Sequence, residues 1–555
     1  MRRDAQAGLI KWAGLAGLAV FLLAAAAAHG QGIVATRHNL SVSGPGQVRA
    51  VGETQVCVFC HTPHGGRVEA PLWNRRDSTA AYIPYNSPTL RARPGQPTGA
   101  SKLCLSCHDG TIALGELAGG AAVAMSGGAT MPPGGGLIGT DLRDDHPISF
   151  DYYGSLAGAG GRLTAPATWD RRVRLDAGSM LQCTTCHNPH DDRWGRFLVM
   201  PNQESALCRQ CHAQPGFALT PHATSSRGWT GQGRDPWPHT EYSDVRSNAC
   251  LNCHRPHHAP GMEHLLADPI QAEACFACHD GSVAARDLAS DFDKRSAHPV
   301  RHGEVSCSDC HNPHRARSEP AHAPAVMGVM EGVGGIDAAG MPVAEARYQY
   351  EVCFKCHAGD RGPRLGRIER QAPGTDLSRV FSTAAPSFHP VQGPGRNPDV
   401  PSLIPPLNEA SMIYCTDCHG SDSDGAGGGA GPHGSNHEFL LRRPYQTGAD
   451  VTETPTAYGL CYGCHSRQSI LSGQSFPYHR LHVVDRRTPC SACHDPHGID
   501  PAWGTTTANA HLINFDLSLA RPEAAGGRLE YRSLGPRAGE CYLTCHGVAH
   551  TPRSY

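Results

Sequence analysis

The chain has 555 residues, of which 39% are hydrophobic and only 6% aromatic, while 64 are glycine and 44 are proline. Its length would give three or four ordinary domains, but such a composition cannot fill that many conventional cores, so another apolar group must supply core volume. The formal charge of −2, without basic runs, argues against a nucleic-acid-binding protein.

The first 31 residues predict a secretory signal peptide. Arg2, Arg3 and Lys11 precede an apolar run at 15–28 that ends in small residues. This run is short for a membrane-spanning helix, which makes a retained anchor the weaker alternative. No later segment is apolar enough to cross a membrane. We therefore expect an exported protein without a transmembrane helix, located in the periplasm, at the outer membrane or outside the cell.

All 24 cysteines fall into twelve pairs, and a histidine follows the second cysteine of every pair. Eleven pairs form strict C-x-x-C-H motifs, the attachment sequence of c-type haem. Their cysteines are Cys57 and Cys60, Cys104 and Cys107, Cys183 and Cys186, Cys208 and Cys211, Cys250 and Cys253, Cys275 and Cys278, Cys307 and Cys310, Cys353 and Cys356, Cys415 and Cys418, Cys461 and Cys464, and Cys490 and Cys493. The twelfth motif, "CYLTCH", has three residues between Cys541 and Cys545.

Three other readings of these cysteines are weaker. A disulfide scaffold leaves the following histidines unexplained. Adjacent Cys and His residues suit a tetrahedral zinc site poorly, and a thioredoxin-like motif would occur once or twice. The sequence thus predicts twelve covalent c-type haems whose macrocycles form the core. The expected fold is a multihaem cytochrome c, mostly coil and loops with short α-helices around a covalent haem chain and very little β-structure.

One axial ligand of each iron is expected from the motif itself. These motif histidines are His61, His108, His187, His212, His254, His279, His311, His357, His419, His465, His494 and His546.

A second histidine follows several motifs behind a proline, as in "CTTCHNPH", which ends at His190. Three residues span at most about 10 Å, too short a path around a macrocycle to its other face, and Pro189 stiffens it. His190 is therefore expected to bind the iron of a different haem. The histidines of this kind are His64, His190, His257, His314 and His497, and His433 follows a glycine-rich insertion.

The motifs form six doublets, and a further histidine precedes each. These upstream candidates are His38, His146, His239, His298, His389 and His482, with His222, His302 and His479 as alternatives to His239, His298 and His482. Both sets together give twelve distal ligands for twelve irons. The remaining histidines are expected to be structural, with His511 and His550 as reserve ligands near the twelfth haem. The expected organisation is a signal peptide at 1–31 and haem doublets at 32–140, 141–220, 221–290, 291–372, 373–473 and 474–555.

Several segments resemble the doubled C-x-x-C-H family of multihaem cytochromes c from metal-reducing and related anaerobic bacteria, some of which are outer-membrane or extracellular proteins. They are "CVFCHTPHGG", "SKLCLSCHDGTIALG", "HRLHVVDRRTPCSACHDPHGI", "HLINFD" and "CYLTCHG". The resemblance implies low-spin bis-histidine haems that pass electrons between periplasm, outer membrane and exterior. It also implies redox partner proteins, namely other cytochromes and an outer-membrane porin.

Electron transfer is the function that these features favour, because two histidines per iron leave one-electron exchange as the available chemistry. We expect an electron carrier rather than a catalyst, with no catalytic residues. One alternative is a reductase for nitrite, hydroxylamine or a sulfur oxyanion with one open iron, for which the haem at Cys541 and Cys545 is the candidate. The other is a subunit of a polymeric haem filament.

Overall fold

The computed structural model describes residues 32–66, 70, 72–359, 368–423, 430–524 and 526–555, so the predicted signal peptide lies outside the described residues. The chain divides into two compact units. Unit 1 comprises residues up to Gln214 together with Ser247–Pro269, and unit 2 comprises Pro215–Arg246 and Ile270–Tyr555. The third predicted doublet is therefore shared, with its first motif in unit 1 and its second in unit 2.

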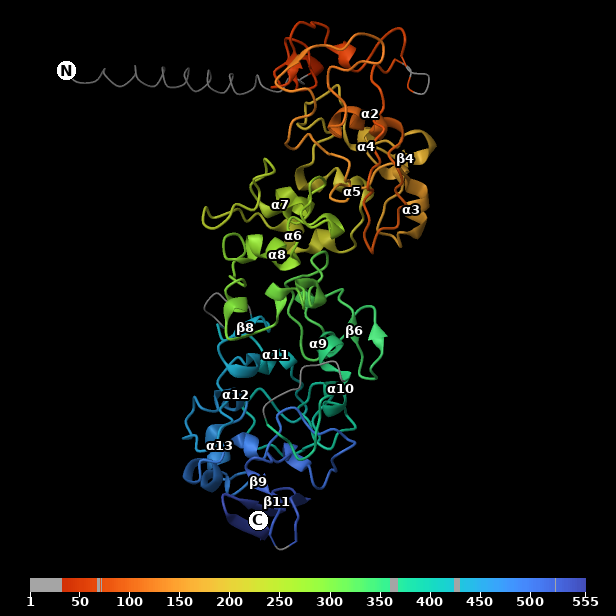
Figure 1. The fold of residues 1–555 in the computed structure, drawn as a ribbon. Helices are drawn as coiled ribbons and strands as arrows, with labels where there is room; N and C mark the ends of the chain where they lie inside the picture. The colour runs from red at the N-terminus through yellow and green to blue at the C-terminus, as the bar shows by residue number, and fades with distance from the viewer. Residues whose placement is uncertain (1–31, 67–69, 71, 360–367, 424–429, 525) are drawn as a thin grey trace, which may run out of the picture. The chain divides into compact units, whose positions relative to one another are not determined.

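Most of the ribbon is irregular, and the helices are short (Figure 1). The α-helices are α2 (Gly99–His108), α3 (Tyr152–Gly158), α4 (Cys183–Cys186), α5 (Cys208–Cys211), α6 (Pro221–Thr224), α7 (Val245–Asn248), α8 (Gln271–His279), α9 (Gln349–His357), α10 (Leu377–Val380), α11 (Cys415–Cys418), α12 (Gly459–Tyr462) and α13 (Arg467–Leu471). This confirms the expected fold class of coil with short helices around the motifs.

All eleven strict motifs lie on one turn of α- or 3₁₀-helix. Besides the α-helices, the 3₁₀ turns that carry motifs begin at Cys57, Ala249, Cys307 and Cys490. A helical turn brings cysteines i and i+3 onto one face, which the two thioethers of one haem require. The backbone amide of the motif histidine closes the turn, as where His187 donates to the carbonyl of Cys183 at 2.9 Å.

Strands are mostly two residues long and tie distant loops together. They are β1 (Arg49–Ala50), β2 (Met125–Ser126), β3 (Phe150–Asp151), β4 (Met180–Leu181), β5 (Ser296–Ala297), β6 (Gly335–Ile336), β7 (Pro342–Val343), β8 (Gly434–Ser435), β9 (Ala520–Arg521), β10 (Glu530–Gly535), β11 (Ala538–Cys545) and β12 (Val548–Ser554). The antiparallel pairs are β1–β2, β3–β4, β5–β8 and β6–β7. β9 to β12 form a four-stranded antiparallel sheet at the C-terminus, with β11 in contact with the other three strands.

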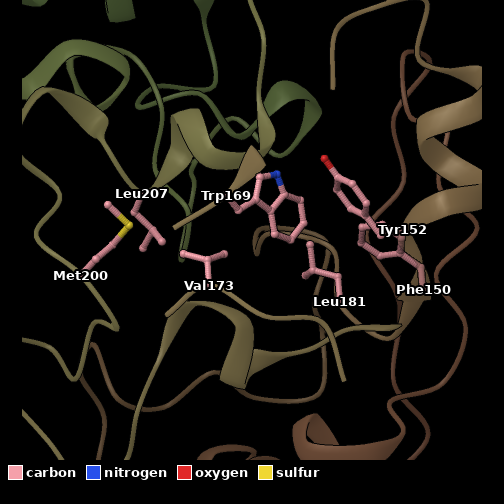
Figure 2. Close-up of a cluster of buried hydrophobic side chains, with 7 residues drawn as sticks. All are labelled: Phe150, Tyr152, Trp169, Val173, Leu181, Met200 and Leu207. Atoms are coloured by element: carbon pink, nitrogen blue, oxygen red, sulfur yellow. The ribbon is translucent and has the colours of Figure 1, made fainter. Parts of the chain in front are cut away.

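The buried hydrophobic clusters are small and lie beside the motif cysteines. In unit 1, Trp169 and Tyr152 form an edge-to-face pair with ring centres 4.8 Å apart, within the cluster shown in Figure 2. The Tyr152 hydroxyl donates to the carbonyl of Cys211 at 3.3 Å, and Cys186 and Cys211 both pack against the cluster. This cluster supports the motif cysteines that pack against it.

Unit 2 repeats this arrangement. One cluster, which includes Tyr350 and Phe354, packs against Cys415. Another, at the C-terminal sheet, includes Phe515, Ala520, Tyr531 and Leu543 and packs against Cys493, Cys541 and Cys545. Within the described residues, no helix combines the length and the hydropathy that a membrane span requires.

Candidate haem-ligand site

Ten motif histidines face a second histidine ring across a constant gap, with ring centres 6.0 to 6.4 Å apart. In unit 1 the pairs are His61 with His190, His108 with His38, His187 with His257, and His212 with His146. In unit 2 they are His279 with His222, His311 with His433, His357 with His298, His419 with His497, His465 with His389, and His494 with His479.

This spacing fits one metal ion between two imidazoles. A metal–imidazole bond is about 2 Å long, so two rings that bind from opposite sides have centres about 6 Å apart. Direct stacking of two rings would bring them closer, and unrelated surface rings would not repeat one distance ten times. The residues present therefore fit an axially bound haem iron at each of these pairs.

Hydrogen bonds fix the tautomer of the motif histidines. The Nδ1 atom donates to a backbone carbonyl, which leaves the lone pair on Nε2, toward the metal position. These bonds are His108 to Gly136 (2.6 Å), His187 to Arg196 (2.9 Å), His254 to His264 (2.8 Å), His311 to Val329 (2.8 Å), His419 to Phe439 (2.9 Å) and His494 to His511 (2.9 Å).

Four of the carbonyls that accept these hydrogen bonds belong to a recurring tight turn that was not predicted from the sequence. Arg196, His264, Phe439 and His511 all have left-handed backbone angles, with φ between 53° and 66°. Two residues later comes a leucine or isoleucine that bridges back to the motif histidine, at Leu198, Leu266, Leu441 and Ile513. The repeated hydrophobic pair after the first motif of a doublet, as in "RFL" and "EFLL", was the available signal. This turn also gives His264 and His511 a structural role, because their backbone carbonyls accept the hydrogen bonds from His254 and His494.

Four of the upstream histidines obtain the same tautomer from prolines. The Nδ1 atoms of His38, His222 and His298 donate to the carbonyls of Pro189, Pro313 and Pro432 at 3.2, 3.2 and 2.7 Å, and that of His389 donates to Pro496. Each of these prolines precedes a "PH" histidine of the following doublet. The "PH" dipeptide thus has two parts with separate tasks, a carbonyl that orients one ligand and an imidazole that faces another iron position.

Within each unit, a "PH" histidine faces the first motif of the preceding doublet. His190, His257, His433 and His497 face His61, His187, His311 and His419. The insertion before His433 does not displace it, because β8 follows at once and pairs with β5, just before His298. His64 belongs to the first doublet; it is exposed, and it faces no motif histidine in the described part of unit 1.

The upstream histidines face the second motif of their own doublet. His38, His146, His298 and His389 face His108, His212, His357 and His465. In the third doublet the ring opposite His279 is that of His222, so the structure favours this alternative over His239. In the sixth doublet His479 faces His494, and His482 faces His550 at 6.3 Å. His254 and His314 lie in different units, and each is described only within its own unit.

Burial favours the neutral form of several of these facing imidazoles. It lowers the pKa of His187, His279 and His494 to about 4, and it lowers those of His146 and His433 to about 4 as well. Neutral imidazole is the form that binds a metal, so these sites do not have to lose protons near pH 7.

Cysteines of consecutive doublets lie next to each other. The first cysteine of a doublet's second motif lies close enough to the first cysteine of the next doublet for the two thiols to shift each other's pKa. This holds for Cys104 with Cys183, Cys208 with Cys250, Cys275 with Cys307, Cys353 with Cys415, and Cys461 with Cys490. None of the 24 cysteines, all of which lie in the described part of the chain, forms a disulfide. Their attachment positions therefore follow one another in sequence order within each unit.

Parts of the chain are similar to known proteins. The family model described as "Doubled CXXCH motif" matches residues 177–216, 243–284 and 405–470. The chain is 28% identical over 190 residues to the multiheme cytochrome MtrA of Shewanella baltica (strain OS185). That match covers 33% of this chain and 44% of the relative, so it spans less than half of the relative's length.

Proposed function

Because the chain is a multihaem cytochrome c with doubled C-x-x-C-H motifs and covalently bound haem, we propose that it conducts electrons along twelve haems arranged in sequence order. The observation that carries this proposal is the set of paired histidine rings at a constant 6.0 to 6.4 Å, one pair for each of ten motifs. Haem iron held by two histidines supplies reversible one-electron exchange and has no free position for a substrate.

The protein's own residues perform three tasks in this account. Helical turns hold both cysteines of a strict motif on one face, backbone carbonyls orient the Nδ1 atoms, and burial lowers the pKa of His187, His279 and His494, which favours their neutral form. The adjacent thiols of Cys104 and Cys183, and of Cys353 and Cys415, place the attachment points of successive doublets together. A row of close redox centres follows from these contacts without any catalytic side chain.

We further propose that the protein is exported, works in the periplasm, at the outer membrane or outside the cell, and exchanges electrons with other cytochromes. A porin-bound conduit is the form of this proposal that would carry electrons across an outer membrane. The apolar leader at 15–28 and the likeness to a multiheme cytochrome support export and cytochrome partners.

Intact mass and electron counting test the proposal. The mature protein is expected to carry twelve haems, to accept twelve electrons from a soluble one-electron donor, and to return them to a one-electron acceptor. A conduit is not expected to reduce more nitrite, hydroxylamine or sulfite than the twelve stored electrons allow. Sustained consumption of one of them would instead identify a reductase with an open iron.

A further inference from the structure

His257 has a hydrogen-bond acceptor of a different kind from that of the motif histidine it faces. The Nδ1 atom of His187 donates to the backbone carbonyl of Arg196 at 2.9 Å. The ring of His257 faces His187, and its Nδ1 atom lies 2.8 Å from Oδ1 of the Asp145 side chain. A hydrogen bond to a carboxylate is shorter than one to a neutral acceptor and roughly twice as strong. The two imidazoles at this position therefore have unlike partners, one neutral and one charged.

Two backbone hydrogen bonds hold this carboxylate beside the ring. The amide of His146 donates to the carbonyl of Pro256 at 2.8 Å, and the amide of Ala259 donates to the carbonyl of Asp144 at 2.9 Å. In four other doublets the carbonyl of the "PH" proline accepts a hydrogen bond from the Nδ1 atom of an upstream histidine, whereas here it accepts one from the main chain. The backbone thus fixes the distance between the carboxylate and the imidazole.

In the described part of unit 1, Asp145 is buried and forms no ion pair with a lysine or arginine. Its side chain is 4% exposed, and its Oδ2 atom accepts no hydrogen bond from the described residues. Such a charge is costly unless a positive charge balances it. Asp495 lies 3.9 Å from another "PH" histidine, His497, but it also lies 3.8 Å from Arg370. At Asp145, an iron bound by His257 supplies the missing positive charge.

We propose that Asp145 lowers the reduction potential of the haem attached at the third motif (183–187), through its hydrogen bond to His257. A carboxylate acceptor makes the imidazole a more basic ligand. Its negative charge also favours oxidised iron, which carries one more positive charge than reduced iron. Hydrogen bonds around the iron are one of the means by which a protein tunes a haem potential. The proposal rests on the proposed function in that an iron lies between His187 and His257.

Asp145 is a positioning residue in this account, because it acts on the iron through an imidazole. It remains ionised in both redox states, so reduction of this haem takes up one electron from a soluble donor and requires no proton. The consequence is an uneven row of haems, in which the third haem in sequence order is reduced later than it would be with a carbonyl partner.

Potentiometric titration of the holoprotein, followed through the haem absorbance, tests this proposal. Asp145→Asn keeps the shape and an acceptor oxygen but removes the charge. It is expected to retain twelve low-spin haems and to raise the equilibrium constant for reduction of one of them about tenfold, which is about 59 mV for one electron. One twelfth of the absorbance change then moves to higher potential. Asp145→Glu restores the charge and is expected to return the potential toward that of the wild type.

Asp144→Asn is the matched control, because it removes the same charge one residue away. The Oδ2 atom of Asp144 lies 4.0 Å from Nδ1 of His258, and its side chain is 30% exposed, so water and salt screen its charge. It is expected to shift the potential much less than Asp145→Asn does. Equal shifts in the two variants, or no shift in Asp145→Asn, would overturn the proposal. If Asp145→Asn does not mature, Asp145→Ser provides a second neutral variant with the same expected direction.

His257→Ala separates a failure of this proposal from a failure of the proposed function. If it yields one high-spin haem while Asp145→Asn shifts no potential, the iron has its expected ligand and only the role of Asp145 is wrong. If His257→Ala keeps every haem low-spin, the ligand pair is wrong, and the role of Asp145 is wrong with it.

Discussion

The Nδ1 atom of His38 donates a hydrogen bond of 3.2 Å to the carbonyl of Pro189, and the next residue, His190, faces His61. One "PH" dipeptide of the second doublet therefore serves both iron positions of the first doublet. The same relationship recurs where Pro432 and His433 serve the fourth doublet and where Pro496 and His497 serve the fifth. Each of these three doublets is thus completed by its successor, as neighbouring units complete each other in repeat proteins.

These ring pairs predict which haem iron each "PH" histidine binds as its second axial ligand. His190→Ala is expected to open the iron of His61, and His257→Ala that of His187, because these are the rings they face. Each single variant should show one high-spin haem by magnetic circular dichroism, and the double variant should show two. A double variant with only one high-spin haem would mean that both histidines serve the same iron.

The third doublet offers a direct comparison of two candidate ligands. His222 faces His279 at 6.2 Å and donates from Nδ1 to Pro313, as other distal histidines do to their prolines. His222→Ala is therefore expected to yield one high-spin haem, while His239→Ala keeps the spin states of the wild type. The reverse pattern in EPR spectra of the two oxidised variants would restore His239 as the ligand.

His64 is expected to be dispensable for iron ligation within the chain. It has the same local motif as His190, but its side chain is exposed and faces no motif histidine in the described part of unit 1. His64→Ala should therefore retain the low-spin haem content of the wild type, in contrast to His190→Ala. A high-spin haem in His64→Ala that depends on protein concentration would instead show that His64 ligates iron in another copy.

A buried ion cluster holds the interrupted "PH" segment. Lys294, whose side chain is 14% exposed, lies 2.6 Å from Asp291 and 2.7 Å from Asp422, just before the insertion that leads to His433. Although burial opposes it, hydrogen bonds to these carboxylates raise the pKa of Lys294.

Lys294→Met leaves the fully buried Asp291 without its cation and is expected to cost about 3 to 5 kcal/mol of unfolding free energy. Denaturant titration followed through the haem absorbance measures this loss. Lys102→Met is the matched control, because its ion pair with Asp77 is more exposed, with Lys102 at 42%, and should cost less than about 1 kcal/mol. Equal stabilities of the two variants would show that the cluster does not hold the segment.

The sequence alone predicts the fold class and that His190 belongs to a haem other than its own. Both follow from local facts, namely motif spacing and the reach of three residues. It does not predict that His222 rather than His239 faces His279. The positions of these rings depend on the paths of the long loops that carry them, which the sequence does not show. The carbonyl turns at Arg196 and Phe439 were also missed, since a backbone acceptor leaves little trace in side-chain chemistry. The strand at the twelfth motif follows from tertiary pairing of β10 to β12 and has no counterpart in the other motifs.

The central claim is that every haem iron in this chain has two histidines as its axial ligands. Near-infrared magnetic circular dichroism together with EPR, on fully matured oxidised protein normalised to haem content, tests it most directly. The account predicts twelve haems per molecule, all low-spin with bis-histidine charge-transfer signals. A high-spin signal equivalent to one haem or more would contradict the claim and place an open, substrate-accessible iron in the protein.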